Sequence, residues 1–304
     1  MKQDIQLTEF IHDPQCKYTI EVYPPRDAND KTHLIACLQR YSALGVRIVN
    51  ITCQSDNIDS TLYLLSSIRK ELPELILVPH INAYALVRDT LDHLVHEYEK
   101  LGISNLFLIR GDIEEKDREF FQTIHASDLV EAVRKKTDQL CIGVAGYPEQ
   151  HFEEPNFFHN MQHLKEKVDK GASYVTTQLF FNNEYYFDFV KRCRVYDIQV
   201  PIIPGITFLK NKKHAEKLLS LVQGTSVPAG LLTDIFHAKS DAEAYARGAK
   251  WCREQVHDLL VSNVVPQVHF YTFNRLEPFD KMISEKTDKK QTVFTSISNA
   301  RKDQ

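Results

Sequence analysis

The chain has 304 residues, of which 43% are hydrophobic and 26% charged, the profile of a soluble globular protein long enough for one α/β barrel. Its net charge is −4 and its isoelectric point is near 6.4, so it lacks the excess of basic residues that is typical of a nucleic-acid-binding protein. No apolar run approaches a membrane span, and the start MKQDIQLTEF is too polar for a secretory signal. We therefore predict a cytoplasmic protein without membrane contact.

Eight short runs rich in β-branched or apolar residues recur along the chain. They are YTIEVY (18–23), VRIVNIT (46–52), LILVPH (75–80), NLFLIR (105–110), CIGVAG (141–146), YVTTQLF (174–180), VPIIPGI (200–206) and VHFYTF (268–273). Apolar residues are nearly continuous in each run, which predicts strands that are buried on both faces of a parallel sheet.

Longer segments with helical spacing lie between these runs. In residues 85–102, Leu86, Leu94 and Leu101 fall close to one helix face, and Gly102 suits a helix C-cap. The segments YSALGV (41–46) and LKEKVDKGA (164–172) likewise place a glycine just before the next strand. The repeated glycine indicates a regular return from helix to strand.

Eight strands alternating with helices predict a single-domain (β/α)₈ TIM barrel of the α/β class. A doubly wound open sheet is the alternative, but it favours a GxGxxG turn after an early strand, and the sequence has none. We place the barrel in residues 1–279 and read residues 280–304 as a polar, weakly ordered tail. The six cysteines are scattered without a CxxC pair, which predicts reduced core thiols.

In a barrel of this kind, the carboxyl ends of the strands carry the chemistry. Seven of the eight predicted strands end with polar or ionisable residues: Glu21, Thr52, His80, Arg110 with Asp112, Tyr147 with His151, Gln178, and Tyr271 with Arg275. Each of these residues alone has a structural explanation, such as a loop-closing ion pair between an arginine and an aspartate. Their convergence on one rim predicts a binding site.

The residue types of this rim exclude several chemistries. The sequence has no HxH or HExxH motif for a metal, no nucleophile elbow for a hydrolytic triad, and no lysine in a predicted strand for a Schiff base. What remains is one carboxylate within a strand, an Arg-Gly-Asp corner, amides and aromatic rings. This set suits the binding of a planar heterocycle and one protonation, with redox power from a cofactor.

Seven strings resemble the methylenetetrahydrofolate reductase family in their order and spacing. They are EVYPPR (21–26), RGD (110–112), ASDLV (126–130), AGYPEQH (145–151), LKEKVDKGASYVTTQLFF (164–181), PIIPGI (201–206) and HFYTFNR (269–275). The resemblance runs from about Tyr18 to Glu277 and is to the short bacterial type. It implies a barrel that binds FAD and uses NADH or NADPH to reduce 5,10-methylenetetrahydrofolate to 5-methyltetrahydrofolate, which supplies methyl groups for methionine synthesis. We also expect ping-pong kinetics and a homo-oligomer.

The resemblance implies roles for individual positions. Glu21 would be the general acid, Asp112 would lie beside the flavin and the pterin, and Gln178 would bind folate and nicotinamide in turn. The implied cofactor positions are Thr52, His80, Arg110, Gly111, Asp112, Ala126, Tyr147, His151 and Lys167, and the implied substrate positions are Glu21, Gln178, Tyr271 and Arg275. No metal is implied. The sequence departs from the family at Lys212, where the family often has an aromatic ring, although Phe208 is nearby.

Two other hypotheses stay open. One is another FAD-linked barrel oxidoreductase, similar to proline dehydrogenase, which would lack the pair of Glu21 and Gln178. The other is a non-catalytic folate-binding subunit of a methyl-transfer complex.

Overall fold

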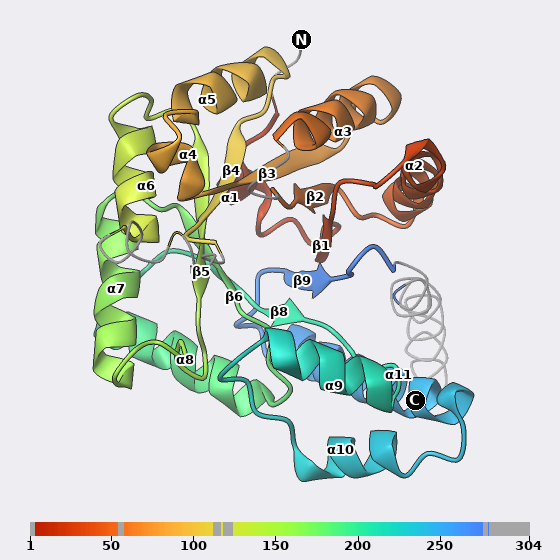
Figure 1. Ribbon diagram of the computed structural model, residues 1–304. Helices are drawn as coiled ribbons and strands as arrows, with labels where there is room; N and C mark the ends of the chain where they lie inside the picture. The colour runs from red at the N-terminus through yellow and green to blue at the C-terminus, as the bar shows by residue number, and fades with distance from the viewer. Residues whose placement is uncertain (1–3, 54–57, 112–116, 118–123, 276–278, 280–304) are drawn as a thin grey trace, which may run out of the picture.

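The computed structural model describes residues 4–53, 58–111, 117, 124–275 and 279. Its strands form one all-parallel sheet that curves into a nearly closed barrel, with helices around the outside (Figure 1). The strands are β1 (Tyr18–Val22), β2 (Ile48–Ile51), β3 (Ile76–Asn82), β4 (Asn105–Ile109), β5 (Cys141–Gly146), β6 (Tyr174–Thr177), β7 (Ile202–Ile203), β8 (Gly205–Ile206) and β9 (Val268–Tyr271). All eight predicted runs form strands, so the predicted barrel is confirmed.

The ninth strand arises because the seventh predicted run is divided at Pro204. β7 pairs with β6, whereas β8 pairs with β9, and the carbonyl of Pro204 accepts a hydrogen bond of 2.9 Å from the His269 N–H. Proline has no N–H for a sheet ladder, so a break at this residue is expected. The two halves of this run therefore connect the two edges of the sheet.

Helices follow the strands around the barrel. They are α1 (Leu7–Phe10), α2 (Ala28–Ala43), α3 (Ile58–Glu71), α4 (Tyr84–Val87), α5 (Leu91–Lys100), α6 (Ala126–Arg134), α7 (Phe157–Asp169), α8 (Asn183–Val195), α9 (Lys212–Leu221), α10 (Ala229–Phe236) and α11 (Asp241–Val261). The glycines predicted to end helices, Gly45, Gly102 and Gly171, have φ of +92°, +70° and +114°. Glycine adopts this left-handed conformation without steric cost, which confirms their role as helix ends.

The single helix predicted over residues 85–102 is wrong. The segment forms α4 and α5, which are separated at Arg88, Asp89 and Thr90, and Asp89 has φ of +53°. A left-handed residue cannot continue a right-handed helix. The three leucines of the predicted face still pack inward, since Leu94 is buried and Leu86 and Leu101 pack against the core.

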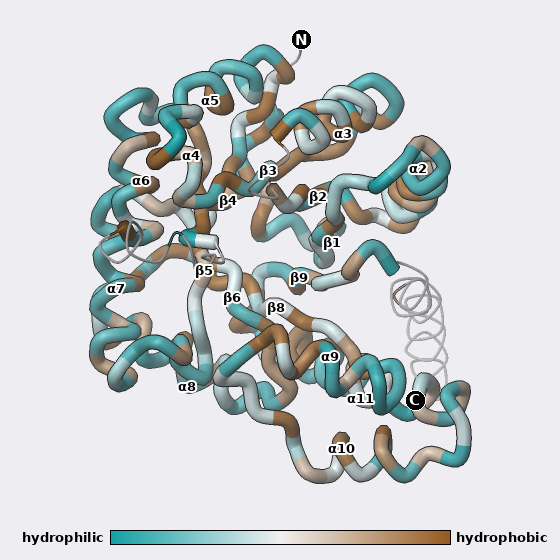
Figure 2. Tube along the Cα trace, in the orientation of Figure 1, coloured by the Kyte–Doolittle hydropathy of each residue, from teal (hydrophilic) through white to brown (hydrophobic). Residues whose placement is uncertain are grey.

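The hydrophobic core has two main layers. Figure 2 shows the apolar segments of the chain in brown. The larger layer lies between the strands and the helices and includes Ile20, Leu65 and Val144. The smaller layer fills the barrel interior toward the amino ends of the strands, where Leu7 and Ile11 from the α1 region pack against Val78 and neighbouring side chains. The floor of the barrel is therefore closed by apolar side chains, and polar side chains gather at the opposite end.

The six cysteines are free, and all are buried except the half-buried Cys53, as predicted for core thiols. The predicted tail, residues 280–304, lies outside the described residues.

Candidate active site

The rim at the carboxyl ends of the strands holds a buried carboxyl group between two histidines. Glu21 Oε2 on β1 lies 3.7 Å from His80 Nε2 on β3 and 3.9 Å from His269 Nε2 on β9. These three residues are only 7%, 4% and 3% exposed. The structure thus brings the predicted residues Glu21 and His80 together, and it adds His269, which the sequence analysis did not select.

Burial controls the charge of His80. Desolvation lowers the pKa of this imidazole to about 4, although the Glu21 carboxylate opposes the shift. The ring packs against Phe107 with 4.8 Å between ring centroids. His80 is therefore neutral at neutral pH, and Glu21 faces a dipole rather than a cation on this side.

Tyr271 closes the same cluster from β9. Its hydroxyl donates a hydrogen bond of 2.8 Å to the Thr177 carbonyl, and its ring meets His269 edge to face. Burial raises the pKa of Tyr271, and the nearby Glu21 carboxylate raises it further, so the phenol keeps its proton. Gly205 makes this packing feasible, because a Cβ there would clash with the Thr177 carbonyl oxygen and lie 2.5 Å from the Tyr271 ring.

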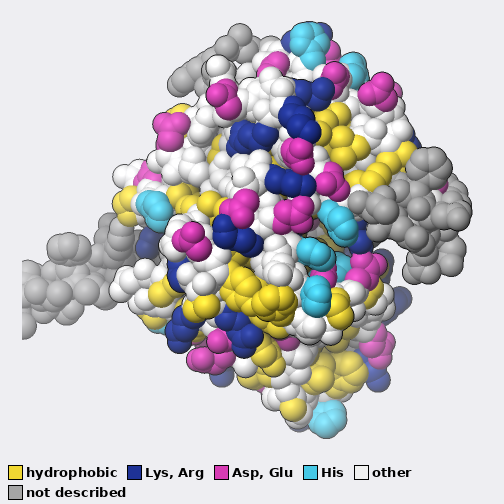
Figure 3. All heavy atoms as spheres, turned by 90° about the vertical axis from the view of Figure 1, so that its left-hand side faces the viewer, with side chains coloured by type: hydrophobic (Ala, Val, Ile, Leu, Met, Phe, Trp, Pro, Cys, Tyr) yellow, Lys and Arg dark blue, Asp and Glu magenta, His cyan; other side chains and the backbone are white. Residues whose placement is uncertain are grey.

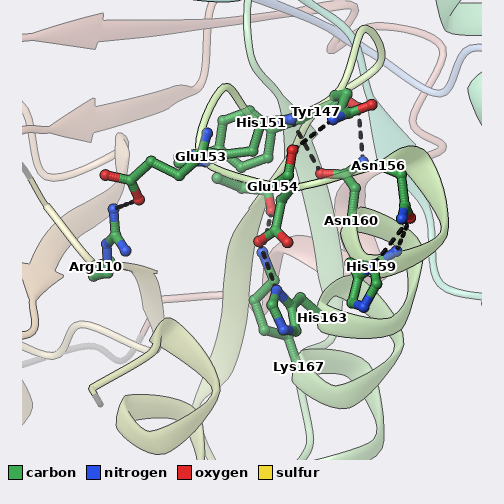
Figure 4. A network of polar contacts seen from close by, with 12 residues as sticks. Arg110, Tyr147, His151, Glu153, Glu154, Asn156, His159, Asn160, His163 and Lys167 are labelled. Atoms are coloured by element: carbon green, nitrogen blue, oxygen red, sulfur yellow. Dashed lines mark hydrogen bonds and ion pairs between the residues drawn. The ribbon is translucent and has the colours of Figure 1, made fainter. Parts of the chain in front are cut away.

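The loop after β5 and helix α7 form the second part of the rim (Figure 4). The rings of Tyr147 and His151 meet edge to face with 4.6 Å between centroids. Asn160 on α7 holds this loop, since it accepts from the His151 N–H at 3.3 Å and donates to the Tyr147 carbonyl at 3.2 Å. Lys167, further along α7, donates a hydrogen bond of 2.6 Å to the Ala145 carbonyl. The predicted residues Tyr147, His151 and Lys167 therefore lie together.

Charges in this second part are also affected by burial. Desolvation lowers the pKa of Lys167 to about 8, against the opposing effect of Glu154 and Glu166. Desolvation also lowers the pKa of His151. The partner of Glu154 is His163 rather than Lys167, because His163 Nδ1 lies 2.6 Å from the Glu154 carboxyl oxygen. Among the described residues, no carboxylate is bonded to the Lys167 amine, which can therefore bind an anion.

Arg110 forms an ion pair with Glu153, which belongs to the same loop after β5 (Figure 4). Their side chains are 27% and 43% exposed. The pair joins the end of β4 to this loop, so Arg110 closes a loop through Glu153, whereas the alternative considered from the sequence was an ion pair with an aspartate. A contact of Arg110 with a cofactor stays a prediction.

Three further predicted cofactor positions have features that suit a ligand. Thr52 Oγ1 is buried and has no hydrogen-bond partner among the described residues, so a ligand group could satisfy it. Ala126 is the first residue of α6, where backbone N–H groups favour an anion. Gly111 has φ of +83°, and a Cβ there would lie 3.0 Å from Asn82 Cβ, so the backbone corner requires glycine.

Gln178 and Arg275 take different positions on the rim. The Gln178 N–H bonds the Gly146 carbonyl at 2.7 Å, and its side-chain oxygen accepts from the Leu179 N–H at 2.9 Å. This half-buried amide therefore keeps its NH₂ donors for another partner. Arg275 is exposed after β9, where an anionic tail of a bound substrate could reach it.

Asp112, predicted to neighbour the flavin, lies outside the described residues. Lys212 stands where the family often has an aromatic ring. It is exposed at the start of α9, and its Nζ lies 5.2 Å from the Phe236 ring centroid. Phe208 is buried and packs against Tyr245 and Phe279, so it belongs to the core rather than to the rim.

Two residues of the rim were not selected from the sequence. His269 lies in the run VHFYTF, where alternation places it on the same face as Tyr271, and this spacing was the available signal. Asn274 has φ of +56° and bonds the Tyr23 backbone twice, at 2.7 Å to the N–H and 3.0 Å to the carbonyl. It fixes the exit of β1 just after Glu21.

Figure 3 shows the outer face formed by the helices on the left of Figure 1. Lysine and arginine side chains alternate there with acidic ones, and histidines gather on one side of the face. No group of three or more His, Cys, Asp or Glu side chains within the described ranges could hold a metal ion. In the same part of the chain, every helix is too short or too polar to cross a membrane.

Comparisons with a family model and with curated proteins point to the same family. The family model of methylenetetrahydrofolate reductase matches residues 6–287. The 5,10-methylenetetrahydrofolate reductase of Escherichia coli (strain K12) is 32% identical over 266 residues, which cover 86% of this chain and 88% of that protein. The probable methylenetetrahydrofolate reductase (NADPH) of Caenorhabditis elegans is 30% identical over 281 residues, but this chain spans only 42% of its length.

A solved structure supports the fold. An uncharacterized protein from Clostridium thermocellum, described as binding two copies of 5-methyl-5,6,7,8-tetrahydrofolic acid, superposes with a TM-score of 0.63. The match covers 92% of this chain and 98% of that one, at 17% sequence identity.

Proposed function

The chain belongs to the methylenetetrahydrofolate reductase family and is an enzyme of this family, and we propose that it reduces 5,10-methylenetetrahydrofolate to 5-methyltetrahydrofolate with NADH or NADPH. The product would supply methyl groups for methionine synthesis. A homo-oligomer in the cytoplasm remains a prediction from the sequence.

The observation that carries this proposal is the buried carboxyl of Glu21 at the rim. Reduction requires the five-membered ring of the folate to open, and ring opening requires a proton on the leaving amine nitrogen. A carboxyl group that is 7% exposed, between imidazoles rather than beside lysine or arginine, is suited to carry and deliver that proton. Because His80 is neutral at neutral pH, it does not hold Glu21 in an ion pair.

The residues of the second part of the rim, together with Thr52 after β2 and Ala126 on α6, fit FAD, the cofactor that the family implies. Bound FAD would carry two electrons from the nicotinamide nucleotide to the folate. The unpartnered hydroxyl of Thr52, the start of α6 at Ala126 and the Lys167 amine would hold its polar groups and its diphosphate. Tyr147 and His151 offer ring faces and edges beside Lys167.

Gln178 suits a pocket that two planar substrates use in turn. Its NH₂ group is available while its oxygen is held by the Leu179 N–H. We infer that the nicotinamide and the pterin ring use this amide alternately, which gives ping-pong kinetics. Arg275, exposed at the same rim, would pair with the glutamate carboxylates of the folate.

Two alternatives make different demands on the same rim. A proline-dehydrogenase-like oxidoreductase needs the FAD residues but no acid paired with an amide, whereas Glu21 and Gln178 are both at strand ends here. A non-catalytic folate-binding subunit needs no buried acid. The Glu21 cluster therefore favours the reductase over both.

The test is anaerobic and uses the purified protein. The proposal predicts a flavin absorption spectrum, bleaching by NADH or NADPH, and recovery of the spectrum on addition of 5,10-methylenetetrahydrofolate with formation of 5-methyltetrahydrofolate. Bleaching without recovery would favour another flavin oxidoreductase. A colourless protein that binds folate would favour the non-catalytic subunit.

A further inference from the structure

Beneath Glu21, the barrel interior contains a hydroxyl and an imidazole that contact each other. Thr19 precedes Glu21 by two residues on β1, so both side chains point into the barrel, one layer apart. Thr19 Oγ1 lies 2.7 Å from His269 Nδ1, and the other ring nitrogen, Nε2, lies 3.9 Å from Glu21 Oε2. Thr19 and His269 are 1% and 3% exposed. One buried imidazole thus lies between a hydroxyl that it hydrogen-bonds and a carboxyl group just beyond hydrogen-bond distance.

The hydroxyl partner matters because a neutral imidazole has two unlike nitrogens, one N–H donor and one acceptor. When Glu21 is a carboxylate, an N–H at Nε2 is favoured, and Nδ1 then needs a donor. When Glu21 carries its proton, the tautomer with an unprotonated Nε2 is favoured, and the N–H at Nδ1 then needs an acceptor. The threonine hydroxyl can rotate to serve as donor or as acceptor.

We propose that Thr19 and His269 are positioning residues that let Glu21 exist in both protonation states, because the His269 ring changes tautomer while Thr19 satisfies Nδ1 in each. This inference rests on the proposed function, in which Glu21 gives up a proton and regains it in every turnover.

The proton count balances in this scheme. The O–H bond of Glu21 breaks as an N–H bond forms on the leaving amine of the folate, whose C–N bond to the one-carbon unit breaks. A proton from water later restores the carboxyl group. Through exchange with water, the imidazole loses the proton on one nitrogen and binds one on the other, so it stays neutral in both states. A buried ring that stayed charged would be costly.

His80 does not have this arrangement, although its Nε2 is 3.7 Å from the same Glu21 oxygen. Its ring lies against the Phe107 ring, and within the described residues no side chain bonds its second nitrogen. The pairing with a hydroxyl is therefore particular to His269 in this cluster.

The test uses Thr19→Val, which removes the hydroxyl with little change in shape, and Thr19→Ser, which keeps it. Tyr174→Phe is the matched control, because it removes another buried hydroxyl of the barrel interior that has no partner among the described residues. Thermal unfolding of the FAD-bound variants confirms that each is folded.

The first readout is the tautomer of His269, measured by ¹⁵N NMR of the FAD-bound protein and assigned by the signal that His269→Gln removes. Adding Glu21→Gln should shift the population between the two tautomers in the native chain and in the Thr19→Ser variant. In the Thr19→Val variant the shift should be absent. The inference would be overturned if Glu21→Gln shifted the tautomer population equally in the Thr19→Val variant, or shifted it in no variant. This outcome does not depend on turnover.

The second readout is the rate at which 5,10-methylenetetrahydrofolate reoxidises the reduced protein. Thr19→Val should lower it about 10-fold, the effect of one lost hydrogen bond, while Thr19→Ser and Tyr174→Phe stay within about twofold of the native rate. If the native protein is reoxidised and Thr19→Val keeps its rate, the inference is wrong and the proposed function stands. If the native protein is not reoxidised, the proposed function fails and the tautomer measurement alone decides the inference.

Discussion

The two parts of the rim differ in how far they exclude water. The side chains of Glu21, His80 and His269 in the first part are at most 9% exposed, whereas those of the ion-paired Arg110 and Glu153 in the second part are 27% and 43% exposed. The first part has its carboxyl group among imidazoles, whereas the second has an arginine and a glutamate within reach of solvent and the desolvated amine of Lys167.

This difference matches two tasks. A carboxyl group delivers a proton well when water and cations are kept from it, because both would favour its charged form. A site for a large anionic cofactor needs side chains that can exchange their partners for the ligand's phosphates, which half-exposed groups do at low cost. We therefore propose that the rim divides into a part for proton transfer and a part for binding.

The largest expected effect comes from Glu21→Gln. The amide keeps the size of the side chain but cannot donate an acidic proton, so reoxidation by 5,10-methylenetetrahydrofolate should fall by about two to four orders of magnitude. Reduction by NADH needs no acid from this residue and should change little. Anaerobic stopped-flow measures both rates. Glu131→Gln, on the outer helix α6, is the control and should resemble the native protein. Equal losses in both rates would indicate a structural role for Glu21.

A smaller and less selective effect is expected for Gln178→Ala. If both substrates use this amide, each half-reaction should be weakened by roughly 1–3 kcal/mol, the cost of a buried polar group that lacks its partner. Steady-state kinetics of the native protein should give parallel double-reciprocal lines. Gln199→Ala, exposed before β7, serves as the control. A loss confined to one half-reaction would show that the substrates bind at separate places.

Lys167→Met tests the binding part of the rim. It should weaken FAD binding about tenfold, because one charge-assisted contact with the diphosphate is lost. In the native protein the Lys167 ammonium loses its proton as the pH rises through its pKa of about 8, so FAD affinity should fall from pH 7 toward alkaline pH, and Lys167→Met should lessen this dependence. Quenching of FAD fluorescence measures the affinity. Lys165→Met on the same helix, where Lys165 pairs with Asp169, should retain the native pH dependence.

The smallest expected effect concerns the stability of the apoprotein in Glu153→Gln. The ion pair of Glu153 with Arg110 is partly exposed, and solvent screens it, so its loss should lower the free energy of unfolding by at most about 1 kcal/mol. Urea unfolding monitored by circular dichroism measures the change. A loss of several kcal/mol would show that this part of the rim depends on its ion pair as strongly as a buried site would.

The barrel could be predicted from the sequence because each strand is encoded locally, as a short apolar run. The break at Pro204 and the left-handed Asp89 were missed, since an isolated proline or aspartate does not specify how the neighbouring strand or helix accommodates it. The carboxyl group of Glu21 was predicted from its strand end. Its relation to His269 was not, because it depends on the pairing of β1 with β9, strands about 250 residues apart, which sets Thr19 opposite His269.

The division of the rim is tested most directly by the rate of folate-driven reoxidation in Glu21→Gln and Lys167→Met, both saturated with FAD. Glu21→Gln should be at least about 100-fold slower than the native protein, whereas Lys167→Met should lose less than about 10-fold, since its defect lies in binding that saturation restores. Equal losses in the two variants, or a larger loss in Lys167→Met, would contradict the assignment of proton transfer to the buried Glu21 cluster.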